Sequence, residues 1–563
     1  GRAEAILWEI EAREITTATT VARDALKASQ RIVPAVPTTV QQATLVQLDG
    51  PFTLPVQAPP STLAINGQPR GGLKLGLQAK LADGLPGVRD WFLAYPYACL
   101  EQKTSKAIGL RDIKLWLALT AQLPGYIDAD GLATYFPPRD GDGRSGSDAL
   151  TAYLLSASHE AAAADALFAL PADSRAAMER GLIAFVEGRI SRNNWSPQKD
   201  LDVRKLAALD ALSRTGKAKA GMLASMTVAP NQWPTHAVIH WVNILKRMAD
   251  APKRTERLAE AMQILRARLT FNGTRMGFST ESADQWWWLM AGADTNAAQL
   301  LLAVIDDPAW KDDIGRLTTG LLARQQRGAW NTTTANLWGS LAVNKFSTRF
   351  ESTPVAGTTK ASTSAGNTSS EWVKGTNPGM LLPWAKDNPA DKLSVAHTGS
   401  GKPWLTLQSL AAVPLTAPFS AGYQIKKTIT PLEQATKGVY RRGDVLRITL
   451  EVIATADMTW VVLSDPIPGG ATILGSGLGR DSEIATQGEK RAGNAWPVFE
   501  ERSFEAMRAY YDVLPKGTVK LEYTVRLNNV GDFALPPTRT EAMYAPEVFG
   551  EMPNARIKVE AAQ

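Results

Sequence analysis

The chain has 563 residues, of which 44% are hydrophobic and 21% are charged. Because one domain usually takes ~100–200 residues, this length allows three or four domains, and the apolar content excludes a wholly disordered polyelectrolyte. The 61 Lys and Arg residues and the 55 Asp and Glu residues leave a formal charge of +6, which is too small at this length to indicate a nucleic-acid-binding protein.

The lengths of the apolar runs and the cysteine content exclude further classes of protein. No apolar run approaches the ~20 residues that cross a bilayer, so we expect no membrane-spanning segment. The first residues, GRAEAILWEI, lack the pattern of a signal peptide, and we expect any targeting segment to lie upstream or to have been removed. The single cysteine, Cys99, excludes an internal disulfide framework, and the four histidines supply a metal site poorly. The sequence therefore predicts no metal and no cofactor, and places any covalent chemistry at Cys99.

Strand and helix patterns alternate along the chain. Short alternating runs separated by Pro and Gly predict strands from about residue 38 to residue 81. From there to about residue 350 the apolar residues recur at helical spacing and predict about ten helices. The stretch STPVAGTTKASTSAGNTSS, residues 352–370, is rich in Ser, Thr and Gly and is predicted to be a linker or a long loop. From Met380 the alternating pattern returns, as is typical of a β-sandwich.

The order of these regions is β, α, β and β, which predicts a multidomain α plus β fold. From this order alone we infer that the first and third regions belong to one sheet domain, and that the helices are inserted into it. Helices of similar length with short connections favour a layered helical body, in which outer helices cover inner ones.

The segment around Cys99 carries the most specific chemistry. Pro96 stands where a helix can begin, and the residues from Leu100 onward favour a helix, so Cys99 is expected near a first helical turn. Cys99 and Gln102 are then neighbours on one face, with Cβ atoms ~5–6 Å apart. Attack of the Cys99 sulfur on the side-chain carbonyl of Gln102, with loss of ammonia, would close a thioester ring whose backbone includes Leu100 and Glu101. Proximity favours such a reaction, and apolar shielding preserves its product from water.

The string YPYACLEQ, Tyr95 to Gln102, resembles the thioester motif of the α2-macroglobulin and complement family. The flanks GLPGVRDWF and KTSKAIGLRD, together with NTTTANLWGSLAVNKF, RAYYDVLPKGTVKLEYTVRL and PPTRTEAMYAPEVFG, resemble its bacterial members, so the resemblance covers most of the chain. One departure is Ala98, where many relatives have Gly. Alanine should be tolerated there unless the position needs a positive φ.

The resemblance implies the C-terminal portion of a bacterial protease trap. An upstream bait segment would be cut by a protease, and the uncovered thioester would then acylate a lysine or hydroxyl of that protease. Cys99 would be the leaving group and Gln102 the acyl donor, so the protein would be an inhibitor with no catalytic residue. The resemblance further implies shielding where the thioester domain meets the C-terminal domain, and we expect Tyr544 and Met543 to cover the bond there while Tyr95 closes the near side.

The resemblance also implies an architecture and a setting. We expect an α/α-toroid thioester domain inserted in a CUB-like β-sandwich and followed by a macroglobulin-like β-sandwich. The expected boundaries are the end of a preceding macroglobulin-like domain or a linker over 1–37, the first CUB-like segment over 38–81, the thioester domain over 82–350, a linker with the second CUB-like segment over 351–415, and the C-terminal domain over 416–563. The implied setting is a monomer in the periplasm, tethered to the inner membrane by an upstream lipidated N-terminus and working beside a peptidoglycan synthase.

Alternatives of other classes remain open. Cys99 could be the thiolate of a cysteine hydrolase or acyltransferase with a distant histidine as base, which would turn over substrate and keep a free thiol. The chain could also be an adhesive or structural module that uses a thioester for attachment. His236 and His240 are four residues apart on a predicted helix, so they fit an acyl-transferring histidine, a metal pair or ordinary packing. We assign neither a catalytic role.

Overall fold

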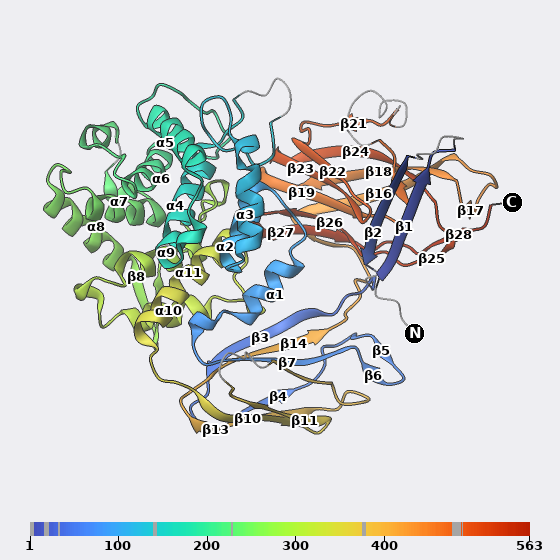
Figure 1. Cartoon of the computed structure of the whole chain (residues 1–563), viewed down its shortest axis with the longest axis horizontal. Coiled ribbons are helices and arrows are strands. Elements are labelled where there is room, and N and C mark those ends of the chain that lie inside the picture. The colour runs from blue at the N-terminus through green and yellow to red at the C-terminus, as the bar shows by residue number, and fades with distance from the viewer. Residues whose placement is uncertain are drawn as a thin grey trace.

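A body of helices and two β-rich bodies make up the chain (Figure 1). The computed structural model describes residues 5–15, 22–31, 34–138, 144–226, 229–373, 379–475, 486 and 488–562. Both helices and sheets are extensive among these residues, so the predicted multidomain α plus β fold class is confirmed. No helix of the described residues is long and apolar enough to cross a bilayer.

Strands from both sides of the helical region share the first β-sandwich. Its two four-stranded sheets have the orders β12-β7-β14-β3 and β11-β10-β13-β4. Three strands precede the helices: β3 (Thr39–Gln47), β4 (Phe52–Val56) and β7 (Gly71–Gln78). Five follow them: β10 (Ala356–Thr363), β11 (Gly366–Glu371), β12 (Gly379–Leu382), β13 (Asp391–Ser400) and β14 (Trp404–Ala411). Because β14 pairs with both β3 and β7, the helical body is an insertion into this sandwich, as the order of the regions predicts.

The predicted linker over residues 352–370 was wrong. Most of that stretch forms the paired strands β10 and β11, and β10 pairs in turn with β13. The physical reason is that threonine suits an extended backbone and that alternate residues of β10 face the sandwich core, where Thr359 and Ala361 are buried. The Thr359 hydroxyl lies 3.0 Å from His397 Nδ1 and accepts a hydrogen bond from the Trp372 indole, so polar residues of this sheet are satisfied internally.

The helical body is packed around one large core. Its helices are α1 (Pro86–Ala94), α2 (Leu100–Gly109), α3 (Ile113–Gln122), α4 (Asp148–Ala164), α5 (Ala172–Val186), α6 (Leu201–Ser213), α7 (Thr235–Arg247), α8 (Arg254–Arg268), α9 (Ala293–Val304), α10 (Ile314–Ala323) and α11 (Thr333–Phe350). A short hairpin, β8 (Leu269–Asn272) with β9 (Arg275–Phe278), lies beside α10. The α2 helix packs against α11, α3 and α4, so its first turn is inside this body.

The C-terminal body is a second β-sandwich. A six-stranded sheet has the order β15-β27-β26-β19-β23-β22, and β16-β18-β24-β20 form the facing sheet with β21 beside β24. The strands that bear on the site are β19 (Met458–Pro466), β23 (Ala506–Leu514), β26 (Thr538–Ala542) and β27 (Ala545–Met552). The remaining large strands are β16 (Tyr423–Glu433), β18 (Val445–Ala454) and β24 (Gly517–Arg526). The shorter strands are β15 (Phe419–Ala421), β20 (Thr472–Ile473), β21 (Arg491–Ala492) and β22 (Phe499–Arg502). Alternate residues of β18 are buried, which is the pattern expected of a sandwich strand.

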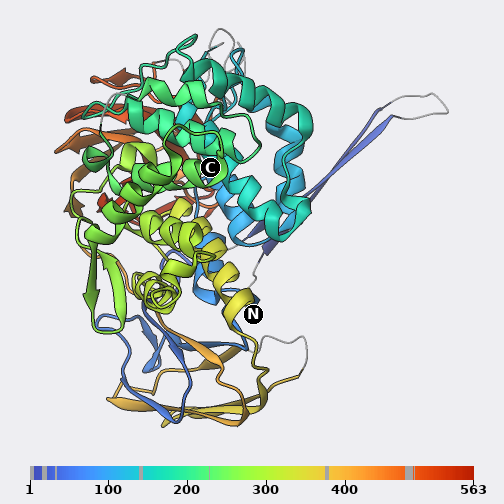
Figure 2. The same cartoon turned by 90° about the vertical axis from the view of Figure 1, so that its left-hand side faces the viewer.

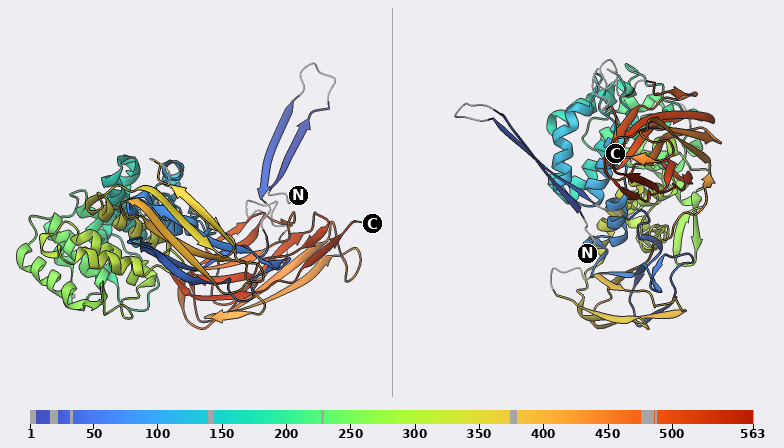
Figure 3. Two further views of the ribbon diagram at one scale, coloured as in Figure 1. Left: turned by 90° about the horizontal axis from the view of Figure 1, so that it is seen from below. Right: turned by 90° about the vertical axis from the view of Figure 1, so that its right-hand side faces the viewer.

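The N-terminal residues form a separate hairpin. Strands β1 (Ala5–Arg13) and β2 (Arg23–Arg31) pair in antiparallel fashion and project away from the other bodies (Figures 2 and 3). Leu7, Ile10 and Leu26 on this hairpin are exposed. The expected linker or domain end over 1–37 is therefore a β-hairpin in the residues that the structure describes.

Candidate functional site

Cys99 and Gln102 meet at the first turn of α2. Cys99 is the residue immediately before the helix, with an extended backbone, and Gln102 is the third residue of the helix. The Cys99 backbone N–H donates a hydrogen bond of 2.9 Å to Gln102 Oε1. This contact uses one of the unpaired donors that every helix N-terminus leaves, and it turns the Gln102 carboxamide back toward the cysteine. Both side chains are almost completely buried.

The nitrogen of the Gln102 carboxamide faces two other predicted site residues. Gln102 Nε2 donates to Tyr95 Oη over 3.2 Å and lies 2.9 Å from Met543 Sδ. The carbonyl oxygen and the amide nitrogen thus point in different directions, one toward the helix start and the other toward a tyrosine and a thioether from the C-terminal body. This fixes the orientation of the carboxamide in a site from which solvent is excluded.

Aromatic rings surround the approach from the N-terminal side. Tyr95 follows α1 and stacks on Trp91 at a centroid distance of 4.7 Å, and it meets the Tyr97 ring edge-on at 5.4 Å. Tyr97 in turn contacts Tyr510 of strand β23 at 6.4 Å. Ala98 lacks a positive φ, so alanine fits this position without strain.

A tight turn of the C-terminal body reaches into the helical body. Ala542 pairs directly with Ala545, so Met543 and Tyr544 are the two residues that connect β26 to β27. The Met543 backbone N–H donates to the Trp460 carbonyl of β19 over 2.9 Å, which anchors the turn to the sheet. Trp460 itself has a φ of +52° and its ring lies 3.7 Å from that of Tyr135, between the two bodies. Met543 and Tyr544 are both buried at this junction.

Glu101 is the acidic group of the site and is completely buried. Its Oε2 accepts hydrogen bonds from Tyr544 Oη at 2.7 Å and from Thr333 Oγ1 at 3.0 Å, and its Oε1 accepts one from Ser105 Oγ. Burial raises the pKa of Glu101, while these three hydroxyl donors oppose that rise. Glu101 therefore joins α2 to α11 and to the C-terminal body.

The thiol of Cys99 is held in its neutral form. Burial raises the pKa of Cys99 strongly, and the neighbouring Glu101 adds to the rise. A thiolate is the reactive form of cysteine in conventional cysteine enzymes, and their environments lower the thiol pKa. Among the described residues no histidine forms a hydrogen bond with Cys99, so the activated pair of a cysteine hydrolase is missing from that portion of the chain.

The structure keeps the two histidines of α7 away from this network. His240 Nδ1 lies 2.7 Å from Asp210 Oδ2, and His236 contacts the rings of His240 and Trp286. Burial lowers the pKa of His236, so its ring is neutral at ordinary pH. Neither histidine forms a described contact with Cys99 or Gln102.

Several residues of the site were missed by the sequence analysis. Two of these, Ser105 and Thr333, donate hydrogen bonds to Glu101. The other two, Tyr135 and Trp460, pack their rings against each other where the helical body meets the C-terminal body. Ser105 lies four residues after Glu101 on the same helix face, a spacing that could have indicated its contact. Nothing in the sequence places Thr333 or Trp460 near α2, because they approach through tertiary packing.

Fold and site together define a class: a helical domain inserted in one β-sandwich, with a Cys–Gln pair buried against a second. Residues 422–547 match the model of the bacterial α2-macroglobulin MG10 domain. An α2-macroglobulin homolog of Nostoc sp. is 23% identical over 380 residues, which cover 63% of this chain and 19% of the relative. The chain thus spans about a fifth of the length of that relative.

Solved structures share the whole fold. Native Escherichia coli α2-macroglobulin, in a structure from domain MG7 to the C-terminus, is 18% identical with a TM-score of 0.67, and the match covers 99% of this chain and 88% of the other. Salmonella α2-macroglobulin reacted with methylamine is 19% identical with a TM-score of 0.66, covering 98% of this chain and 36% of that one. The resemblance to bacterial α2-macroglobulins found in the sequence is confirmed by the domain match, the relative and the shared fold.

Proposed function

We propose that this chain is the thioester-bearing C-terminal portion of a bacterial protease trap. The observation that carries the proposal is the orientation of Gln102: its carbonyl oxygen is held by the Cys99 N–H, and its amide nitrogen is covered by Tyr95 and Met543. Similarity to the bacterial α2-macroglobulins supports the coarser statement that the protein inhibits proteases rather than hydrolysing a substrate. The bait segment and its cleavage belong to the proposal as well.

Ring closure can be written from these contacts. The Cys99 sulfur attacks the side-chain carbonyl carbon of Gln102, the C–N bond of the carboxamide breaks, and the thiol proton leaves with the nitrogen as ammonia. The Cys99 backbone N–H, already 2.9 Å from the carbonyl oxygen, would stabilise the negative charge that develops there. Because both groups are fixed at one helical turn, the reaction is intramolecular and avoids the entropy loss of an encounter.

Capture of a target opens the thioester and transfers its acyl group. A lysine amine or a hydroxyl of the protease attacks the thioester carbonyl, the carbon–sulfur bond breaks, and Cys99 leaves as a thiol. The acyl group of Gln102 remains attached to the protease, so each molecule reacts once. In this proposal the buried turn of Met543 and Tyr544 keeps nucleophiles out until the C-terminal body moves.

The finer architecture and setting belong to the same proposal. The helical body would be the α/α-toroid thioester domain, the first sandwich the CUB-like domain and the second the C-terminal macroglobulin-like domain. Attacking proteases would be the covalent partners of a periplasmic monomer tethered through a lipidated N-terminus upstream. A peptidoglycan synthase as a further partner has no support from the relatives.

Intact-mass measurement tests the thioester directly. We expect the native chain to weigh one ammonia less than its sequence, and methylamine to add its own mass while releasing one thiol per molecule. A native mass equal to that calculated from the sequence, with a thiol that titrates before methylamine is added, would contradict the proposal.

A cysteine hydrolase would show catalytic turnover with that free thiol. An adhesive module would form the thioester but fail to couple to proteases when the full-length protein is cleaved by them. These two outcomes separate the alternatives from the trap.

A further inference from the structure

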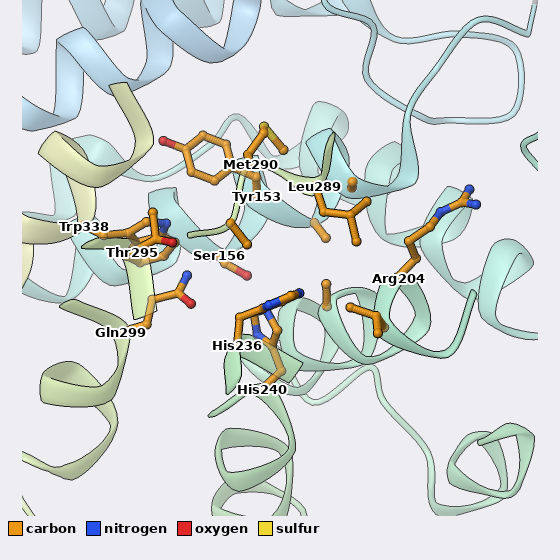
Figure 4. Close-up of a pocket in the computed structure, with 15 residues that line it drawn as sticks. Tyr153, Ser156, Arg204, His236, His240, Leu289, Met290, Thr295, Gln299 and Trp338 are labelled. Atoms are coloured by element: carbon orange, nitrogen blue, oxygen red, sulfur yellow. The ribbon is translucent and has the colours of Figure 1, made fainter. Parts of the chain in front are cut away.

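A cavity that is not lined by Cys99, Glu101 or Gln102 lies inside the helical body. Its volume is about 60 Å³, and its polar lining includes His236 and His240 of α7, Ser156 of α4 and Gln299 of α9. This space is larger than the ~10–15 Å³ that one water molecule needs, and it is small for an organic ligand. Figure 4 shows the Ser156 hydroxyl and the Gln299 carboxamide pointing toward the two imidazoles.

His236 has an unusual environment for a buried histidine. The residue is only 4% exposed, and neither of its ring nitrogens has a hydrogen-bond partner in the part of the chain that the structure describes. Leaving a buried polar group unpaired costs ~1–3 kcal/mol, so native structures usually provide a partner for it. The ring contacts Trp286 and His240 and lines the cavity, which is therefore the place where such a partner would sit.

His240 lines the same cavity and has one ring nitrogen that can bind a ligand there. Its Nδ1 is bonded to Asp210 Oδ2 at 2.7 Å, which leaves Nε2 without a hydrogen-bond partner among the residues the structure describes. A carboxylate on one imidazole nitrogen is the arrangement that orients histidine ligands in metal sites. Asp210 is in turn bonded to Arg247 and lies 3.7 Å from Arg214, so its position is fixed.

The two imidazoles lie next to each other at the cavity. They are four residues apart on α7, and their ring centroids are 6.2 Å apart, with the planes nearly perpendicular. An ion bound by both rings through nitrogen bonds of ~2.0–2.1 Å would require the two rings to move closer together. The guanidinium of the lining, Arg204, is paired with Asp148 and Asp200 and does not leave an unbalanced charge there.

We infer that His236 and His240 bind a first-row divalent cation of the kind that prefers imidazole, such as Zn²⁺, Ni²⁺ or Cu²⁺. Water and the oxygens of Ser156 or Gln299 would complete the coordination. Among the described residues no third His, Cys, Asp or Glu joins the pair, so we expect a dissociation constant in the micromolar range rather than that of a closed structural site. His240 and Gln299, which line the cavity, are half-buried.

Calorimetric titration of the complete chain with ZnCl₂ tests the site. We expect one Zn²⁺ per chain, and an affinity at least tenfold lower in His236→Gln and in His240→Gln. The matched control is His159→Gln, because His159 is exposed on α4 outside the cavity. A Cys99→Ser variant should bind as the wild type does, which separates this site from the thiol and from the proposed thioester.

A measurement on the unaltered chain keeps the inference testable if the cavity variants fold poorly. With one equivalent of Cu²⁺, pulsed electron paramagnetic resonance should show two coordinated imidazoles, since His236 and His240 are the histidine pair on one helix turn. The inference is overturned if the wild type binds no Zn²⁺ up to millimolar concentration, if folded His236→Gln and His240→Gln both bind it unchanged, or if Cu²⁺ shows fewer than two imidazoles.

Discussion

Tyr544 Oη donates a 2.7 Å hydrogen bond to Glu101 Oε2, and this bond joins the turn between β26 and β27 to the first turn of α2. The same turn places Met543 Sδ 2.9 Å from the Gln102 amide. Two adjacent residues of the C-terminal body therefore contact two adjacent residues of the CLEQ segment. Because these contacts are lost together if the bodies separate, docking of the C-terminal body and protection of the carboxamide are one structural event.

Replacing Tyr544 tests that coupling. Tyr544→Phe keeps the ring but removes the hydroxyl, and loss of one hydrogen bond to a charged group costs ~1.5–3 kcal/mol. If much of that energy holds the turn in place, methylamine should be incorporated about tenfold faster, since ~1.4 kcal/mol corresponds to a factor of ten. Tyr544→Ala also removes the ring and should increase the rate further. The measurement is the mass increase with time in methylamine.

A second buried tyrosine of the same body provides the control. The Tyr423 hydroxyl has no hydrogen-bond partner within the described ranges, so Tyr423→Phe should leave both the incorporation rate and the stability nearly unchanged. An unchanged rate in Tyr544→Phe and Tyr544→Ala alike would remove Tyr544 from the shielding of the site.

Gln102→Glu should abolish ring closure. A carboxylate has no amide nitrogen to expel, so the variant should keep its full calculated mass and a thiol that titrates after unfolding without methylamine. Its stability should fall as well, because a second carboxylate would be buried close to Glu101 and Met543. Gln102→Asn is the matched control: its mass should also be unchanged, without the added charge. A loss of ammonia in either variant would contradict the assignment of Gln102.

How much of this site the sequence predicts depends on how far its components lie from one another in the chain. Cys99, Gln102 and Tyr95 follow from local helix spacing and from the motif, and the structure brings them together at one helix start. Met543 and Tyr544 were expected there only through the family resemblance. Thr333 and Trp460 were not expected at all, since no local pattern encodes a contact across more than two hundred residues.

In the fold, too, local patterns predict some features, whereas others depend on pairing between distant segments. Hydrophobic periodicity predicts the helical body and its end near Phe350, and the order of regions predicts the insertion. Composition alone predicts a linker at β10 and β11, which are rich in Ser and Thr. Those residues are strands because they pair with β13 and bury alternate side chains, and this pairing with a distant partner is invisible in composition.

Removing one partner of a buried ion pair should destabilise the helical body. Arg204 of α6 is bonded through Nε to Asp148 Oδ1 at 2.9 Å, and both side chains are at most 6% exposed. Asp148→Ala leaves a buried guanidinium with a weaker partner in Asp200, and breaking such a pair costs ~3–5 kcal/mol. Thermal or urea unfolding should show this loss. Arg556→Ala is the control, because the exposed Arg556–Asp532 pair should change stability very little.

Glu101 should give the protein a pH dependence opposite to that of a salt-bridged carboxylate. Burial raises the pKa of Glu101 above its ordinary value near 4.5, so the folded chain binds this proton more tightly than the unfolded chain does. Stability from this group is therefore greatest below pH 4.5 and falls as the pH rises from there to the raised pKa, by ~1.4 kcal/mol for each unit of difference. Glu101→Gln cannot ionise, so the unfolding free energy of the wild type minus that of the variant should decrease with pH across this window. A difference that stays flat, or rises, would show that the three hydroxyl donors outweigh burial and that Glu101 is an ionised anchor for Tyr544 throughout.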